Sequence, residues 1–142
     1  MPTSVCILLA LELGMLAMRA PQKPMQLAPC PSTPNCVSTQ SSDPAKRMDP
    51  IAYTGSVDDA RATLLRILDR PRVEIVASTE LFVHAVFTTR IMRFRDDVEF
   101  LFDPDAGVIH FRSASRVGRS DLGTNRRRME SLAQDLESAW HE

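Results

Sequence analysis

The stretch DVEFLFDPDAGVIHFRS, residues 97–113, decides the fold of this chain. Apolar and polar residues alternate on both sides of its centre, which is typical of two half-buried β-strands. Between them, Asp103-Pro104-Asp105-Ala106-Gly107 predicts a turn, because proline fixes its own φ and glycine accepts a positive φ. The stretch therefore predicts a β-hairpin.

The turn also predicts the register of this hairpin. Pairing Asp103 with Val108 closes a four-residue loop, which is a common hairpin length. One face of the hairpin then carries a row of apolar side chains, while the other places Glu99 opposite Arg112, within reach of an ion pair. A slip by one residue would move charges into the core, so we expect this register to be well specified.

Charged and hydroxyl side chains gather at the open end of the predicted hairpin. Asp96 and Asp97 lie at the start of the first strand, and Ser113, Ser115 and Arg116 lie at the end of the second. A loop that contains two glycines follows directly. We therefore expect carboxylates, hydroxyls and guanidinium groups to converge there.

The residues after this loop have the spacing of an α-helix. Apolar residues recur at intervals of three and four from Met129 to Trp140 and form one apolar stripe. Thr124 or Asn125 is the expected N-cap, because both residue types can accept a hydrogen bond from the first turn.

The first turn of this helix carries three consecutive arginines, residues 126–128. Cations are unfavourable at a helix N-terminus, which is the positive end of the helix dipole. Such local conflicts concentrate at functional or specially paired sites. We expect a negatively charged group to offset the charge of the arginines. The candidates are Asp96, Asp97, Asp121 and a bound ligand.

The chain before the hairpin predicts one more helix and two more strands. Ser56 and Asp59 resemble a capping box at the start of a helix over residues 56–69. Two largely apolar stretches, 73–77 and 81–88, predict strands. The order helix, four strands, helix, with short connections, predicts an α+β two-layer domain over residues 50–142: a four-stranded antiparallel sheet with helices packed on one face.

The other face of the sheet would carry Glu99 and Arg112, with His84 or His110 beside them. A lone strand histidine is usually solvated, so neither histidine is assigned a catalytic role.

The N-terminal part of the chain differs from the rest. Residues 1–20 are an apolar segment interrupted by Glu12, too short for a confident membrane-spanning helix and without a basic residue before the apolar run. We expect either a degenerate export signal or an extra amphipathic helix. Residues 21–49 are rich in proline and serine and predict a linker.

Two of the three cysteines, Cys30 and Cys36, lie in this linker. Their spacing, without a second ligand pair or a nearby histidine, does not fit a zinc site. If the protein is exported, a small disulfide loop is the better interpretation. In the cytoplasm they would be two ordinary thiols.

Composition excludes some partners. The chain has 142 residues and a net charge of −1, so it lacks the basic excess of a nucleic-acid-binding domain. We expect no nucleic acid, metal or cofactor, and membrane association only through the N-terminal segment.

Three motifs resemble a known family. They are CPxxPNCVS at residues 30–38, FxDDxEF at 94–100 and RSASRxGxSDLGxNRxR at 112–128. Together they resemble the bacterial and plastid family called domain of unknown function 1499, from about Cys30 to the C-terminus. The resemblance implies a fold and a site but no established activity. Its members often follow an export or membrane segment, which favours a cell-envelope or periplasmic location over the cytoplasm.

One departure from the family pattern bears on chemistry. The family has an acidic residue after a His-Ala pair, whereas Val86 follows His84-Ala85 here. This departure weakens an acid/base role built on that pair.

The preferred hypothesis for function is a non-catalytic module that binds a small anionic molecule or a protein partner. Arginine side chains suit carboxylate and phosphate groups geometrically, and a helix N-terminus adds donors. The expected ligand-binding residues are Asp96, Asp97, Glu99, Arg112, Ser113, Ser115, Arg116, Asp121, Asn125, Arg126 and Arg128.

Two alternatives remain open. A hydrolase-like or metal-assisted enzyme would use Asp96, Asp97 and Glu99 as ligands or as an acid/base pair, but the arginines would compete for these carboxylates, which favours binding over catalysis. A structural envelope protein would use the same charges as an internal ion-pair network. A cluster of exposed apolar residues outside the helical stripes would support this third hypothesis.

Overall fold

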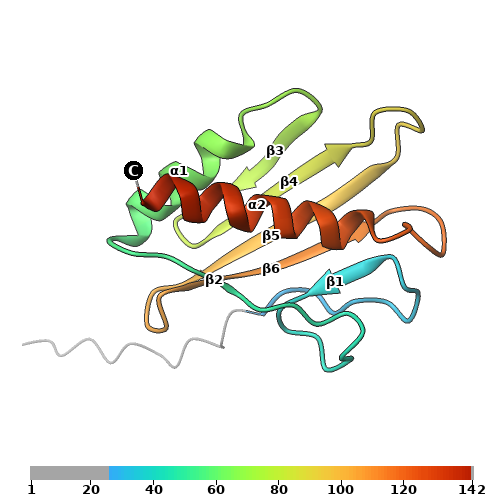
Figure 1. Cartoon of the computed structure of the whole chain (residues 1–142), viewed down its shortest axis with the longest axis horizontal. Coiled ribbons are helices and arrows are strands. Elements are labelled where there is room, and N and C mark those ends of the chain that lie inside the picture. Colours follow the sequence, from blue (N-terminus) through green and yellow to red (C-terminus); the bar gives the residue numbers. More distant parts are fainter. Residues whose placement is uncertain (1–25, 142) are drawn as a thin grey trace, which may run out of the picture.

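The computed structural model describes residues 26–141 and has two helices over one face of an antiparallel sheet (Figure 1). The expectations for residues 1–20 fall outside the described residues. Within residues 26–141, no helix is both long and apolar enough to cross a membrane. The elements are β1 (Cys36–Ser38), β2 (Ile51–Ala52), α1 (Val57–Leu68), β3 (Val73–Ser78), β4 (Phe82–Thr88), β5 (Arg95–Asp103), β6 (Val108–Ser115) and α2 (Thr124–Trp140).

The α+β class is confirmed, but the prediction of four strands is wrong. The described sheet has six strands in the order β1-β6-β5-β4-β3, and β2 also pairs with β6. The two additional strands, β1 and β2, have only three and two residues. Strands this short carry no readable alternation, and pairing with β6 rather than local sequence defines them. β1 lies inside the stretch expected to be a linker.

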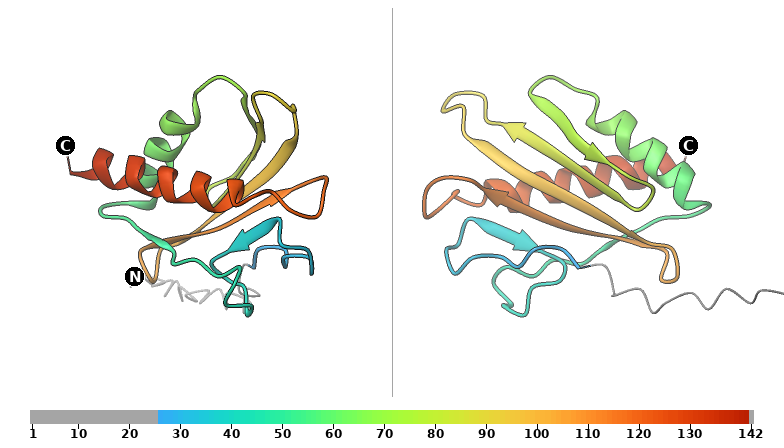
Figure 2. Two further views of the ribbon diagram at one scale, coloured as in Figure 1. Left: turned by 45° about the vertical axis from the view of Figure 1, so that its right-hand side comes forward. Right: turned by 180° about the vertical axis from the view of Figure 1, so that it is seen from behind.

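The predicted register of the central hairpin is confirmed. Asp103 pairs with Val108 and Glu99 pairs with Arg112 across β5 and β6. Phe100 lies on the face that the helices cover, where it is fully buried in the core cluster. The opposite face carries no helix, as the view from behind shows (Figure 2). We call this uncovered side the open face.

Helix α1 begins as the sequence predicts. The Ser56 hydroxyl accepts a hydrogen bond from the backbone N–H of Asp59 at 3.1 Å, and donates one to the Asp59 carboxylate at 2.7 Å. Ala60, Leu64 and Leu68 form its buried face. This face packs toward the same sheet surface as α2 (Figure 1).

The predicted N-cap of α2 is wrong. Gly123 occupies the cap position with a left-handed φ of 77°, and Thr124 is already helical. The Asp121 carboxylate instead accepts hydrogen bonds from the N–H groups of Gly123 and Asn125, each at 2.9 Å. A side chain two residues before the cap position therefore satisfies the helix end, and the Asn125 side chain is available for other contacts.

Candidate functional site

All the predicted site residues except Arg126 fall into two clusters on opposite faces of the sheet rather than one. Successive residues of a strand point to opposite faces. Asp96 therefore faces α2, whereas Asp97 lies on the open face. The helix-side cluster is Asn35, Asp96, Ser113, Ser115, Asp121, Asn125 and Arg128. The open-face cluster is His84, Asp97, Glu99, Arg112 and Arg116.

An ion pair between α2 and β5 forms the base of the helix-side cluster. Arg128 donates to the Asp96 carboxylate at 2.5 Å, and Asp96 is only 1% exposed. The same guanidinium donates to the Asn125 side-chain oxygen at 2.8 Å and to the Ser113 hydroxyl at 3.2 Å. It also lies 4.9 Å from the centre of the Phe87 ring. A buried carboxylate is thus matched by a well-coordinated cation.

Asn125 connects the remaining members of this cluster. It accepts a hydrogen bond from the Ser113 hydroxyl at 2.6 Å. Its amide donates to the Ser115 hydroxyl at 2.9 Å, to the Asp121 carboxylate at 2.5 Å and to the backbone carbonyl of Asn35 at 3.2 Å. Burial raises the pKa of Asp121, but the hydrogen bonds from Asn125 and Gly123 outweigh it, so this pKa is lowered overall.

Most polar groups of the helix-side cluster therefore hydrogen-bond one another, and Asp96 Oδ1 is its one buried oxygen without a partner among the described residues. The cluster ties α2, β5, β6 and the stretch before β1 together, and the Asn35 side chain extends it by donating to the carbonyl of Gly118 at 2.7 Å. This is the geometry of a structural lock, with donors and acceptors turned inward. Asn35 was absent from the expected site residues, although it stands in the first of the three sequence motifs.

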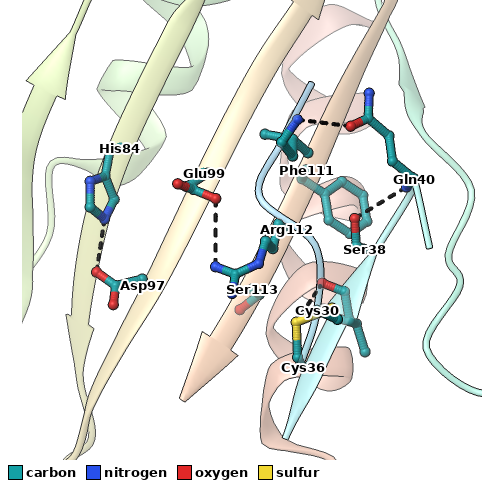
Figure 3. A network of polar contacts seen from close by, with 12 residues as sticks. Cys30, Cys36, Ser38, Gln40, His84, Asp97, Glu99, Phe111, Arg112 and Ser113 are labelled. Atoms are coloured by element: carbon teal, nitrogen blue, oxygen red, sulfur yellow. Dashed lines mark hydrogen bonds and ion pairs between the residues drawn. A yellow bond between two sulfur atoms is a disulfide. The ribbon is translucent and has the colours of Figure 1, made fainter. Parts of the chain in front are cut away.

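On the open face, Asp97 contacts both Arg116 and His84, and Figure 3 shows its contact with His84. Arg116 donates to both oxygens of the Asp97 carboxylate, each at 2.8 Å, and His84 Nε2 lies 2.8 Å from Oδ1, one of the same two oxygens. The hydrogen bonds from Arg116, helped by those from His84, lower the pKa of Asp97 to about 2, against the opposing effect of burial. Asp97 is therefore a fixed anion at neutral pH and cannot serve as a proton donor.

Glu99 and Arg112 form a looser pair in the same row (Figure 3). Their nearest atoms are 3.6 Å apart, and the side chains are 19% and 15% exposed. Neither side chain makes a hydrogen bond within the described residues, and Arg112 Nε and Glu99 Oε2 are buried without a partner. Buried polar groups are normally hydrogen-bonded, so this pair is the incompletely satisfied part of the open face.

The disulfide between Cys30 and Cys36 borders this row (Figure 3). Cys36 pairs with Ala114 and Ser38 pairs with Arg112 where β1 joins β6. Lys46 fastens the same segment by donating to the carbonyl of Pro31. The stretch expected to be a linker thus forms the border of the open face next to Arg112.

Two further expectations concern the remaining charges. Arg126 donates to the backbone carbonyl of Ala45 at 2.9 Å, so it is used to hold the chain before β2. The carboxylate set proposed for an enzyme is not assembled, because Asp96 faces the helices while Asp97 and Glu99 face away from them. Among residues 26–141, no group of three histidine, cysteine, aspartate or glutamate side chains could hold a metal ion.

Fold and site together define a small α+β protein with one antiparallel sheet, two helices on one face and a charged open face. A family model described as "Protein of unknown function (DUF1499)" matches residues 26–136, and the chain belongs to this family. The resemblance noted in the sequence is therefore confirmed, and the match includes the stretch before β2. A comparison with curated proteins finds no match.

Proposed function

We propose that this protein is a non-catalytic binding module whose open face holds a small anionic group, a carboxylate or a phosphate, at Arg112. The observation that carries the proposal is the unsatisfied guanidinium of Arg112. It is largely removed from water, yet it donates no hydrogen bond within the described residues.

The other three arginines of the expected site are already engaged. Arg116 is bidentate to Asp97, Arg126 donates to a backbone carbonyl, and Arg128 belongs to the helix-side cluster. A guanidinium carries five donors in a rigid fork that matches carboxylate and phosphate oxygens. Of these four arginines, Arg112 alone has a guanidinium that donates no hydrogen bond among the described residues. This makes it the anchor of the proposed site.

The neighbours of Arg112 support recognition of a compact anion. Partial burial lowers the effective dielectric and strengthens a charge-assisted hydrogen bond. The Glu99 carboxylate is too far from the Arg112 guanidinium to form a hydrogen bond. A bound anion would therefore replace only a weak contact, although the charge of Glu99 would repel it. Arg116 pairs with Asp97 and offsets its charge, which limits the repulsion of the ligand by Asp97.

A cell-envelope location is part of the proposal. A disulfide joins Cys30 to Cys36 beside Arg112, and disulfides persist in oxidising compartments rather than in the cytoplasm. Thiol alkylation of cell extracts, before and after reduction, would measure the redox state of this pair. Two free thiols in living cells would favour the cytoplasmic alternative.

Thermal denaturation of the full chain tests anion binding. Inorganic phosphate and succinate serve as probes, with sodium chloride at matched ionic strength as the reference. A ligand that binds only the native state stabilises it by RT ln(1 + [L]/Kd), or about 2.7 kcal/mol at 100 times Kd. We expect one probe to raise the Tm by several degrees beyond the salt reference.

Two variants with opposite expected effects make this test specific. Arg112→Gln should abolish the shift, because the anchoring charge is lost. Glu99→Gln should enlarge it, because a competing negative charge is removed while the side chain keeps its shape. Arg66→Gln, at an exposed arginine of α1, is the matched control. A shift that survives Arg112→Gln, or no shift with either probe, would refute the proposed site.

A further inference from the structure

Exposed apolar side chains gather at one end of the sheet. The loop between β4 and β5 presents Ile91, Met92 and Phe94, and the loop between β6 and α2 presents Val117 and Leu122. Ile91 is 86% exposed and Leu122 is 85% exposed, so both tips stand almost free of the protein. We call these five residues the end patch.

The two loops start side by side. Asp96 pairs with Ser115 at the last ladder position of β5 and β6, and the N–H of Arg116 then donates to the carbonyl of Arg95 at 3.1 Å. Figures 1 and 2 show both loops projecting from the same end of the sheet, away from the β5–β6 turn. Both tips therefore project from the same end of the sheet.

Basic side chains surround the apolar tips. Arg90, Arg93 and Arg119 are exposed and form no ion pair among the described residues. Arg95 and Arg116 stand at the base of the loops, where each pairs with a carboxylate. Although the net charge of the chain is −1, this end carries an excess of positive charge.

The loops also hold unusual backbone conformations. The non-glycine residues with positive φ in the described chain are Arg72, Arg93 and Leu122, at 64°, 56° and 52°. Arg93 and Leu122 lie in the two loops, and Arg72 lies next to the β4–β5 loop, because its carbonyl accepts from the N–H of Thr88 at the end of β4. Left-handed backbone is unfavourable for such residues and concentrates at functional sites.

We propose that the end patch docks on the surface of an anionic lipid bilayer, with Ile91 and Leu122 entering the interface and the arginines contacting lipid phosphates. Apolar side chains next to basic ones combine burial with attraction to anionic lipids. A bilayer accepts two separate tips without a complementary shape. Nucleic acid fits poorly, because Phe94 is the one aromatic residue of the end patch and single-strand binding relies on several aromatic side chains on which successive bases stack.

This surface lies outside the Arg112 site, so the two proposals are independent. Docking by the end patch would leave the open face exposed beside the membrane. It would also act separately from residues 1–25, whose apolar run was the only membrane contact expected from the sequence.

A site-specific probe in the full chain tests the proposal and separates it from binding by residues 1–25. Cys6→Ser leaves the bonded pair as the only cysteines under oxidising conditions. Leu122→Cys is then labelled with the fluorophore NBD. Adding vesicles of phosphatidylcholine and phosphatidylglycerol should shift the emission to the blue, and nitroxide-labelled lipids should quench it.

The matched control places the same label at Ala106→Cys, an exposed position in the β5–β6 turn at the opposite end. This label should stay in water. Vesicles of pure phosphatidylcholine should bind the end patch far more weakly than vesicles that also contain phosphatidylglycerol. The triple variant Arg90→Gln/Arg93→Gln/Arg119→Gln should weaken binding roughly fivefold per arginine near the surface, or about 100-fold in all.

Two outcomes would overturn the proposal. If vesicles change the NBD emission at residue 122 no more than that at residue 106, the end patch does not enter the bilayer. This holds whether or not the vesicles capture the protein. If neutral and anionic vesicles give equal shifts, the arginines do not direct docking. Circular dichroism and the Tm of each variant confirm that the compared proteins are folded.

Discussion

Two arginine–carboxylate pairs on opposite faces of the sheet should differ in their contribution to stability. Arg128 contacts Asp96 at 2.5 Å and holds two further hydrogen bonds. Arg112 faces Glu99 at 3.6 Å and makes no hydrogen bond within the described residues. Truncating each arginine to alanine therefore compares a short, hydrogen-bonded pair with a loose one in the same fold.

The structure gives the expected magnitudes. Arg128→Ala leaves the Asp96 carboxylate, 1% exposed, without its counter-ion, and breaking a buried pair costs about 3–5 kcal/mol. The lost contact with the Phe87 ring adds about 0.5–1 kcal/mol. Arg112→Ala should cost less than Arg128→Ala, because the Glu99 side chain is 19% exposed and is hydrated more easily than that of Asp96, which is 2% exposed.

Urea unfolding at neutral pH, followed by circular dichroism, measures both free energies of unfolding. Arg66→Ala, at an exposed arginine of α1 outside any ion pair in the described chain, should change stability by less than about 0.5 kcal/mol. Since a domain of this size has a total stability of about 5–15 kcal/mol, Arg128→Lys provides a milder variant. It keeps the charge but cannot bridge Asp96 and Asn125 with one fork.

Equal costs for Arg128→Ala and Arg112→Ala would refute the distinction between a structural cluster and an available anchor. A cost below about 1 kcal/mol for Arg128→Ala would mean that Asp96 regains water when its partner is removed. A cost of several kcal/mol for Arg112→Ala would instead show that the Glu99 pair is buried in solution and that the guanidinium is not free for a ligand.

Three further predictions concern single features. The pKa of Asp97 is lowered from 3.8 to about 2, chiefly by Arg116. The ionised Asp97 therefore stabilises the fold fully above its pKa in the unfolded chain, and this contribution should disappear as the pH falls from about 4 to about 2. Acid titrations of wild type and Asp97→Asn should converge at the low end of this range. Removing the six-residue-separated disulfide by Cys30→Ser/Cys36→Ser should lower the free energy of unfolding by about 2 kcal/mol in a denaturant titration, and unchanged stability would contradict its structural role. Asp121→Ala should cost about 1 kcal/mol through the lost helix cap, and hydrogen exchange should be faster in the first turn of α2 than in its last turns.

Local patterns in the sequence were sufficient for the central hairpin and for α1. The alternation over residues 97–113 determined both the strands and their register, because a one-residue slip would bury charges. Ser56 and Asp59 identified the start of α1 through chemistry within one turn. The start of α2 was misjudged because Asp121 caps it across Gly123, a contact that depends on the left-handed backbone between them.

The small strands were missed for a different reason. β1 and β2 exist only through pairing with β6, and neither contains enough residues to show alternation. In β1, the disulfide and the hydrogen bond from Lys46 hold a proline-rich segment against the sheet. Tertiary contacts of this kind override local composition, so a segment with the residues of a linker becomes part of the sheet.

The division of the charged residues into two clusters follows from the same alternation that predicted the hairpin. Asp96 and Asp97 are neighbours in a strand, so they must point to opposite faces, and Ser113 and Arg112 must do the same on β6. The residues alone therefore implied two sites. What they could not show is which arginine remains unsatisfied. That depends on tertiary contacts, because the position of α2 over the sheet brings Arg128 to Asp96, whereas Arg112 on the other face has only the loose pair with Glu99.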